Sequence, residues 1–127
     1  MIDALFSQPE YIAAKKMLDA NALRQEAIAS NLANLETPNY RRIDVAGSFS
    51  NELRDAIASG DPGKLNDLQP RLEVDATAVA TNRDGNTVQL ENELMNLQQN
   101  FLQHGVETHL VTYNLLRLKS AILGQPQ

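Results

Sequence analysis

The sequence contains no cysteine and no tryptophan, and aromatic residues make up only 5% of its 127 residues. Without cysteine the chain cannot form a disulfide framework or a thiolate metal site, and it has no cysteine nucleophile. Large side chains that could anchor a compact core are scarce. The length suffices for one small domain, so we treat residues 1–127 as a single unit.

Basic residues are also fewer than acidic ones. The chain has 11 lysine and arginine residues and 16 aspartate and glutamate residues, which gives a net charge of −5. Nucleic acid is excluded as a partner, since phosphate binding requires a basic face. The N-terminal segment carries Asp3 where a cleavable signal peptide needs positive charge, and it lacks an apolar run of about 7–15 residues. Any export is therefore expected to use a route that reads no such signal.

Residue patterns typical of catalysis or metal binding are missing too. His104 and His109 are five positions apart and do not share a helical face as a metal pair would. We expect His104 to be at least partly buried and His109 to be solvated. Asp84, Glu91 and Glu93 lie near the start of an expected helix, where acids complement its dipole. We predict that the protein is not an enzyme and that it uses no cofactor, metal ion or small-molecule substrate.

Proline and glycine are concentrated between Pro38 and Gly85, which leaves a long stretch at each end almost free of helix breakers. The first stretch predicts a helix over residues 9–35, with Pro9 in its first turn. Its apolar residues follow two seven-residue repeats, which are Tyr11, Leu18 and Leu32, interrupted by Gln25, and Ala14, Ile28 and Leu35, interrupted by Asn21. Either the two amides are buried and set the register with a partner helix, or they are partly exposed.

The second stretch predicts a helix over residues 90–123 with a seam typical of coiled coils. The seam residues recur at spacings of three and four: Leu94, Leu97, Phe101, His104, Thr108, Val111, Leu115, Leu118 and Ile122. Leu102, Leu110 and Leu116 add a second apolar edge. Each helix is about 40–50 Å long at 1.5 Å per residue, so the short middle cannot cover both. The predicted fold is mainly α, a hairpin of two long terminal helices that pack as a coiled coil.

Residues 43–88 form the irregular middle of this hairpin. Phe49, Leu53 and Ile57 predict one short amphipathic helix, stopped by the turn at residues 59–63. Residues 71–75 alternate weakly like a short strand. Little regular structure and little or no β structure are otherwise expected, and Leu65 is expected to lie in a loop.

Residues 30–42 end the first helix in a defined way. Asn34 and Thr37 can satisfy terminal backbone groups, and Pro38 prevents the helix from continuing. The four residues from Thr37 to Tyr40 then form a turn in which Asn39 tolerates positive φ. The turn is either a presented surface, from which Tyr40 and the two following arginines project toward neighbouring subunits, or a solvated helix end with the ring packed locally.

The run Ser30-Asn31-Leu32-Ala33-Asn34-Leu35-Glu36-Thr37-Pro38-Asn39-Tyr40 resembles a signature of the flagellar rod, hook and hook-associated axial proteins. In that family the first helix ends in Asn-Leu-Ala-Asn, two residues, and Thr-Pro-Gly-Tyr. Asn39 departs from the family glycine, and His104 departs from an aromatic residue. Together with the C-terminal helix, the resemblance covers roughly half of the chain. The run from Arg83 into the last helix is most similar to that of a proximal rod protein.

The resemblance implies a structural subunit of the flagellar basal-body rod that polymerises through its terminal helices into the periplasm-spanning drive shaft. Its implied partners are other copies, other rod proteins, basal-body proteins at the junction of export gate and membrane ring, and, in transit, the type III export apparatus. Another proximal rod protein, or a cytosolic helical adaptor, is the alternative. The isolated chain is expected to be mostly monomeric, partly disordered at both ends and prone to associate at high concentration.

From the two seams and the motif we predict an assembly interface. Its residues are Leu18, Ile28, Asn31, Leu32, Asn34, Leu35, Thr37, Pro38, Asn39, Tyr40, Leu94, Leu97, Phe101, Val111, Leu115, Leu118 and Ile122. Substitution of Leu32 or Leu115 is expected to impair assembly more than substitution of Leu65.

Overall fold

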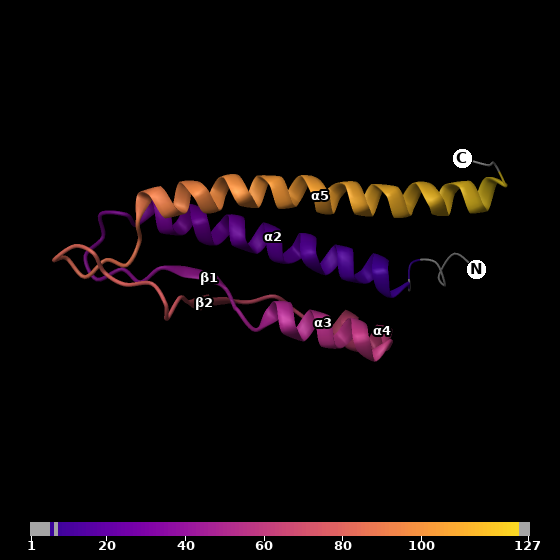
Figure 1. The fold of residues 1–127 in the computed structure, drawn as a ribbon, viewed down its shortest axis with the longest axis horizontal. Helices are drawn as coiled ribbons and strands as arrows, with labels where there is room; N and C mark the ends of the chain where they lie inside the picture. The colour runs from indigo at the N-terminus through magenta and orange to yellow at the C-terminus, as the bar shows by residue number, and fades with distance from the viewer. Residues whose placement is uncertain (1–5, 7, 125–127) are drawn as a thin grey trace.

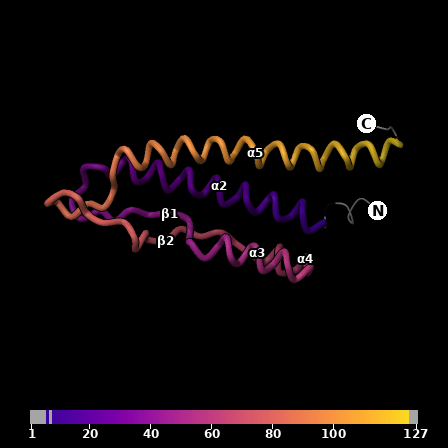
Figure 2. Tube along the Cα trace, viewed as in Figure 1, coloured from indigo at the N-terminus to yellow at the C-terminus, as the bar shows by residue number. Residues whose placement is uncertain are grey.

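The computed structural model describes residue 6 and residues 8–124. Helix α2 (Pro9–Ala33) and helix α5 (Leu90–Leu123) run side by side in opposite directions, and the segment between them forms a third layer on the far side of α2 (Figure 1). The mainly α fold with two long terminal helices is confirmed. The Cα trace in Figure 2 shows that α2 and α5 diverge from the turn end toward their free ends.

Helix α2 starts at Pro9 as predicted, but it ends at Ala33, two residues before the predicted end. The backbone N–H of Asn34 donates to the carbonyls of Ser30 and Asn31 at 3.1 and 3.2 Å. These contacts tighten the last turn into the segment that leads to Pro38. Leu35 therefore lies after the helix, half-buried.

The third layer contains more regular structure than the sequence predicts. Strands β1 (Ile43–Val45) and β2 (Leu72–Val74) pair antiparallel, with Ile43 opposite Val74. Strand β2 falls on the predicted alternation, whereas β1 was not predicted. Helix α3 (Phe49–Ser59) is the predicted amphipathic helix, and Gly60 ends it with φ 65°. Helix α4 (Pro62–Asp67) follows, and the side chain of Asp61 accepts a hydrogen bond from the backbone of Gly63 at its start.

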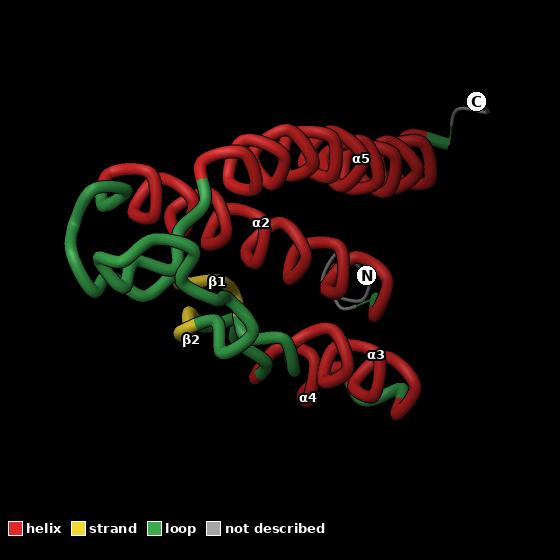
Figure 3. The backbone as a smooth tube through the Cα atoms, turned by 60° about the vertical axis from the view of Figure 1, so that its left-hand side comes forward, coloured by secondary structure: helices red, strands yellow, loops and turns green. Residues whose placement is uncertain are grey.

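Figure 3 shows the third layer beside α2, and the apolar core lies between them. It comprises Ile12, Ala13, Ala20, Val45, Phe49, Leu53, Ala56 and Leu65. The expected loop position of Leu65 is wrong, because α4 turns this side chain inward until it is fully buried. Its substitution would remove core packing, so Leu65 cannot serve as a neutral control for interface variants. Ile57 is exposed instead, and Ala56 faces the core.

The contact between α2 and α5 is largely polar. The side-chain amide of Asn21 donates to the backbone oxygen of Asn100 at 3.1 Å, and that of Asn100 donates to the backbone oxygen of Asn21 at 3.2 Å. The Asn100 amide also donates to Gln25 at 2.8 Å. Asn21 is buried, so the structure favours the register role for this residue. Among the described residues, no helix is both long and apolar enough to cross a bilayer.

Candidate assembly interface

Helix α5 presents a row of large apolar side chains along its length that are more than a third exposed in the single chain. We call this set the apolar face of α5. Its residues are Leu90, Leu94, Met95, Phe101, Leu102, Val106, Leu110, Tyr113, Leu115, Leu116, Ile122 and Leu123. Contiguous exposed apolar surface of this kind marks sites of association, because scattered single residues are normal but an extended row is not.

The apolar face is exposed because α5 turns a polar row toward α2. Glu93, Asn100 and Glu107 recur every seven residues, and all three are buried. The predicted apolar seam is consequently split. Leu97, Val111 and Leu118 are half-buried beside the polar row, whereas Leu94, Phe101, Leu115 and Ile122 are exposed. The expected burial of His104 is wrong, since this residue is exposed too.

The predicted interface residues of α2 lie mostly inside the chain. Ile28 is fully buried, and Leu18 and Leu32 are half-buried. Helix α5 is therefore the helix with the larger exposed apolar surface.

Asn31 joins α2 to the third layer. Its side chain is fully buried, and it forms two hydrogen bonds with the backbone of Ile43. The Asn31 amide donates to the Ile43 carbonyl at 2.8 Å, and the Ile43 N–H donates to Asn31 Oδ1 at 3.0 Å. Asn34 acts more locally, because its amide donates to the carbonyl of Ser30 at 2.8 Å, one turn earlier. The two asparagines of the motif thus have different tasks.

The turn after α2 is held in place by residues that lie more than forty positions later in the sequence, just before α5. Asn39 has φ 59°, which confirms the predicted left-handed conformation, and its N–H donates to the carbonyl of Asp84 at 2.8 Å. The side chain of Asn86 donates to the carbonyls of Asn34, Leu35 and Thr37 at 2.9, 3.0 and 2.9 Å. These carbonyl groups lie just beyond the end of α2, and those of Asn34 and Thr37 also accept from the backbone N–H groups of Thr37 and Tyr40. Sequence reasoning missed Asn86, because an asparagine in a turn gives no local sign of a distant role.

The exposed tip of this turn consists of Thr37, Pro38 and Asn39. Tyr40 does not project from it. Its hydroxyl lies 3.0 Å from Ser30 Oγ and donates to Asn31 Oδ1 at 3.4 Å, so the half-buried ring packs back on α2. For Tyr40, the structure favours the alternative of local packing.

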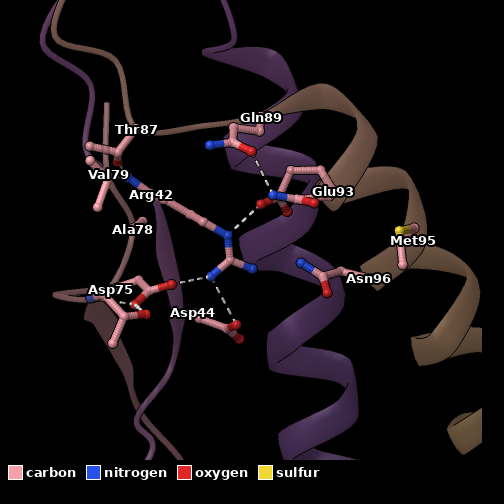
Figure 4. A pocket seen from close by; sticks show the side chains of 12 residues that line it. Arg42, Asp44, Asp75, Ala78, Val79, Thr87, Gln89, Glu93, Met95 and Asn96 are labelled. Atoms are coloured by element: carbon pink, nitrogen blue, oxygen red, sulfur yellow. Dashed lines mark hydrogen bonds and ion pairs between the residues drawn. The ribbon is translucent and has the colours of Figure 1, made fainter. Parts of the chain in front are cut away.

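Arg42 was expected to project as well, but it is buried in an ion-pair cluster (Figure 4). Its Nε donates to the fully buried Glu93, and its Nη1 donates to Asp75 at 2.8 Å and to Asp44 at 3.1 Å. Burial lowers the pKa of Arg42, but the hydrogen bond and charge of Glu93, together with Asp44, raise it above its ordinary value. Glu93 lies in the first turn of α5, as expected for a charge that complements the helix dipole, and its carboxylate also pairs with this guanidinium.

The ion-pair cluster forms the floor of a pocket of about 500 Å³, with Val79 and Met95 among its lining residues. The three carboxylates of Asp44, Asp75 and Glu93 all pair with Arg42, so the cluster ties β1, the segment after β2 and the first turn of α5 together. No group of three or more metal-ligating side chains occurs within residues 8–124 or at residue 6.

Comparison with known proteins identifies the family. A family model described as "Flagella basal body rod protein" matches residues 18–41, which contain most of α2 and the turn. The chain is also 32% identical to the flagellar basal body rod protein FlgB of Borrelia hermsii over 119 residues, which cover 80% of this chain and 86% of that protein. The chain belongs to the FlgB family of flagellar basal body rod proteins. The FlgB proteins of Borreliella burgdorferi (29% identity, 75% of this chain and 82% of that protein) and Salmonella typhimurium (28%, 87% and 90%) are further relatives.

This FlgB-family assignment confirms the resemblance drawn from the motif. The matched residues 18–41 include Asn21, Asn31 and Asn39, whose side chains or backbone hold the hairpin and its turn together. The relatives' names describe a component of the flagellar basal body and name no catalytic activity.

Glu107 supplies a test of the polar contact between the helices. Its carboxyl is buried, and Oε2 has no hydrogen-bond partner among the described residues. Burial raises the pKa of Glu107, and the charges of His104 and Arg24 offset this only in part. A pKa raised by folding means that ionisation costs stability, so the free energy of unfolding should fall as the pH rises from the ordinary glutamate pKa of 4.5 through the folded-state pKa.

Replacement of Glu107 with glutamine is expected to stabilise the chain at neutral pH by about 1 kcal/mol, because it removes a buried carboxylate that lacks a full set of partners. Urea unfolding at several pH values, followed by circular dichroism, would measure the effect. The Glu107→Gln variant should also show a smaller loss of stability between mildly acidic and neutral pH. An unchanged pH dependence would contradict this account.

Proposed function

We propose that this FlgB-family chain is a structural subunit of the proximal rod, where it polymerises through its terminal helices and carries out no catalysis. The apolar face of α5 is the observation that carries the proposal. A helix of 34 residues that exposes leucine, phenylalanine and isoleucine along its length gains stability when neighbours cover it. Contacts that join one surface to a different surface on the next subunit propagate into a filament.

The proposed partners are other copies of the chain, other rod proteins, and basal-body proteins where the rod meets the export gate and the membrane ring. The proposed location is the periplasmic rod of the basal body, reached through the type III export apparatus. Membership in a family of basal body rod proteins supports assembly with rod components. A cytosolic adaptor would not require the family's motif.

Two groups of predicted interface residues are available for contact in the single chain. The first group is the exposed part of the seam, which is Leu94, Phe101, Leu115 and Ile122, and the second is the turn tip, which is Thr37, Pro38 and Asn39. The other predicted interface residues are buried or half-buried. We propose that these support assembly by holding the hairpin in shape.

The test compares exposed apolar residues on different layers. In a strain that lacks the gene, Leu115→Ser and Ile122→Ser should each restore far fewer flagella than Ile57→Ser, which changes an equally exposed residue on α3. Each buried aliphatic side chain is worth about 1.5–3 kcal/mol, and the loss repeats in every subunit. Flagella are counted by electron microscopy, and swimming is scored in soft agar.

All three purified variants should unfold at the same temperature as the unaltered chain, since the altered side chains are exposed. Equal flagellation by the three variants would refute the role of the apolar face. A strain without the gene that still makes flagella would refute the rod function and favour an adaptor.

A further inference from the structure

A second pattern runs along α5, on the side turned away from α2. We call it the Gly105 stripe. Its residues follow one another at spacings of three and four, and all are exposed: Glu91, Leu94, Gln98, Phe101, Gly105, His109, Thr112, Leu116 and Lys119. Residues at these spacings share one face of a helix. The stripe shares Leu94, Phe101 and Leu116 with the apolar face, and it excludes Leu115 and Ile122.

Gly105 has no explanation within the single chain. It lies in the interior of α5, where glycine weakens a helix relative to alanine. It is not among the described glycines with positive φ, and a methyl group placed on it would meet nothing within 4 Å. It does open a shallow hollow lined by Phe101, Leu102, Val106 and His109. Mid-helix glycine without a conformational role permits the backbone of another helix to approach closely.

The stripe is nearly symmetrical about this glycine. Leu94 and Leu116 lie eleven positions before and after Gly105, and Phe101 and His109 lie four positions before and after it. The charges are arranged in the opposite sense, because Glu91 precedes the glycine by fourteen positions and Lys119 follows it by fourteen. A surface of this kind is complementary to the same surface of a second copy whose helix runs in the opposite direction.

We propose that a second copy of this chain packs α5 against α5, antiparallel, around a two-fold axis between the two Gly105 residues. Each leucine at 94 then meets the leucine at 116 of the second copy, and each phenylalanine at 101 meets the histidine at 109. Glu91 faces Lys119 twice in the pair. A parallel pair in register would place Glu91 beside Glu91 and Lys119 beside Lys119, so charge selects the antiparallel orientation.

The rest of the subunit leaves room for this contact. Figures 1 and 3 show that α2 and the third layer both lie on one side of α5, and the Gly105 stripe is on the side turned away from them. A two-fold contact uses the same surface on both copies and closes on itself, so it cannot extend into a filament. The pair is therefore a resting form that covers part of the apolar face before assembly and separates when the subunit joins a rod.

Charge reversal tests the orientation. Sedimentation velocity of the full chain over a range of concentrations should show a monomer–dimer equilibrium. Glu91→Lys and Lys119→Glu should each weaken dimerisation by roughly tenfold, because each turns two attractive pairs into repulsive ones. The double variant should recover most of the affinity, since it restores opposite charges in the antiparallel pair.

Gly105→Ala provides a control, because it should raise the stability of the monomer and lower the affinity of the dimer. The monomer should resist unfolding better, because alanine favours a helix, while dimerisation should weaken because the added methyl groups separate the helices. Dimerisation that is unchanged or stronger in this variant would overturn the close approach at Gly105.

Cross-linking tests the register directly, because the chain contains no cysteine. A mixture of Gln98→Cys and Thr112→Cys should form a disulfide-linked dimer, and Gln98→Cys alone should not. A chain that stays monomeric at millimolar concentration, or Gln98→Cys that links to itself, would overturn the proposal. Neither result would affect the rod function, whose test uses Leu115 and Ile122 in cells.

Discussion

Replacement of Arg42 with alanine is expected to lower the free energy of unfolding by about 3–5 kcal/mol, the usual cost of removing one partner of a buried ion pair. Glu93 is fully buried, and the Arg42 guanidinium is its cationic partner. Without it, the carboxylate remains buried near Asp44 and Asp75, which also lose their contacts with Arg42. Small domains are stable by only about 5–15 kcal/mol, so a large part of the stability would be lost.

Urea or thermal unfolding followed by circular dichroism measures this change. Arg41→Ala is the matched control, because the neighbouring arginine is exposed and its removal should change stability by less than about 0.5 kcal/mol. Arg42→Lys should fall between the two, since lysine keeps the charge but not the planar fork that reaches several carboxylates. Equal stability of the Arg41 and Arg42 variants would show that the cluster does not hold the fold together.

Asn31→Ala should cost about 2–4 kcal/mol. The side chain satisfies both the N–H and the carbonyl of Ile43, and each buried polar group left without a partner costs about 1–3 kcal/mol. Asn34→Ala is the comparison within the same motif. Its amide nitrogen donates to a carbonyl one turn away, and its Oδ1 accepts from the Thr37 hydroxyl at 3.2 Å. Neither bond is fully buried, so about 1 kcal/mol is expected. Comparable losses from the two substitutions would contradict the separate tasks assigned to them.

Asn31→Asp separates the two hydrogen bonds. Aspartate can still accept from the Ile43 N–H but cannot donate to its carbonyl, and it places a second carboxylate near Glu93, whose Oε2 lies 3.4 Å from the Asn31 amide. Its loss of stability should therefore be greater at neutral pH than in mild acid, where the new carboxyl is protonated. Unfolding at the two pH values tests this difference.

The long helices could be predicted because their signals are local. The scarcity of proline and glycine outside residues 38–85 marks α2 and α5, and the proline followed by Asn39 marks a turn with positive φ. Helix α3 could be predicted equally well from its apolar spacing and the glycine after it. Each of these features depends on residues within about two turns of chain.

The orientation of α5 could not be predicted in the same way. Apolar periodicity shows which residues leave water, but it does not show whether they do so within the chain or against a neighbour. The apolar spacing predicts that the seam through Phe101 is the face that packs, yet the single chain turns Asn100 toward α2. The pairing of Arg42 with Glu93 joins residues 51 positions apart, and local patterns carry no information about such a contact.

The reciprocal pair of Asn21 and Asn100 also has a mechanical consequence. An apolar seam can slip by one heptad, about 10.5 Å at 1.5 Å per residue, and find similar neighbours again. Directional bonds between these amides and the opposite backbone cannot survive such a step, and neither can the ion pair at Glu93. Two helices locked in this manner resist shear along their common axis. In a subunit that carries torque, the two helices would transmit the force between them and would not slide along each other.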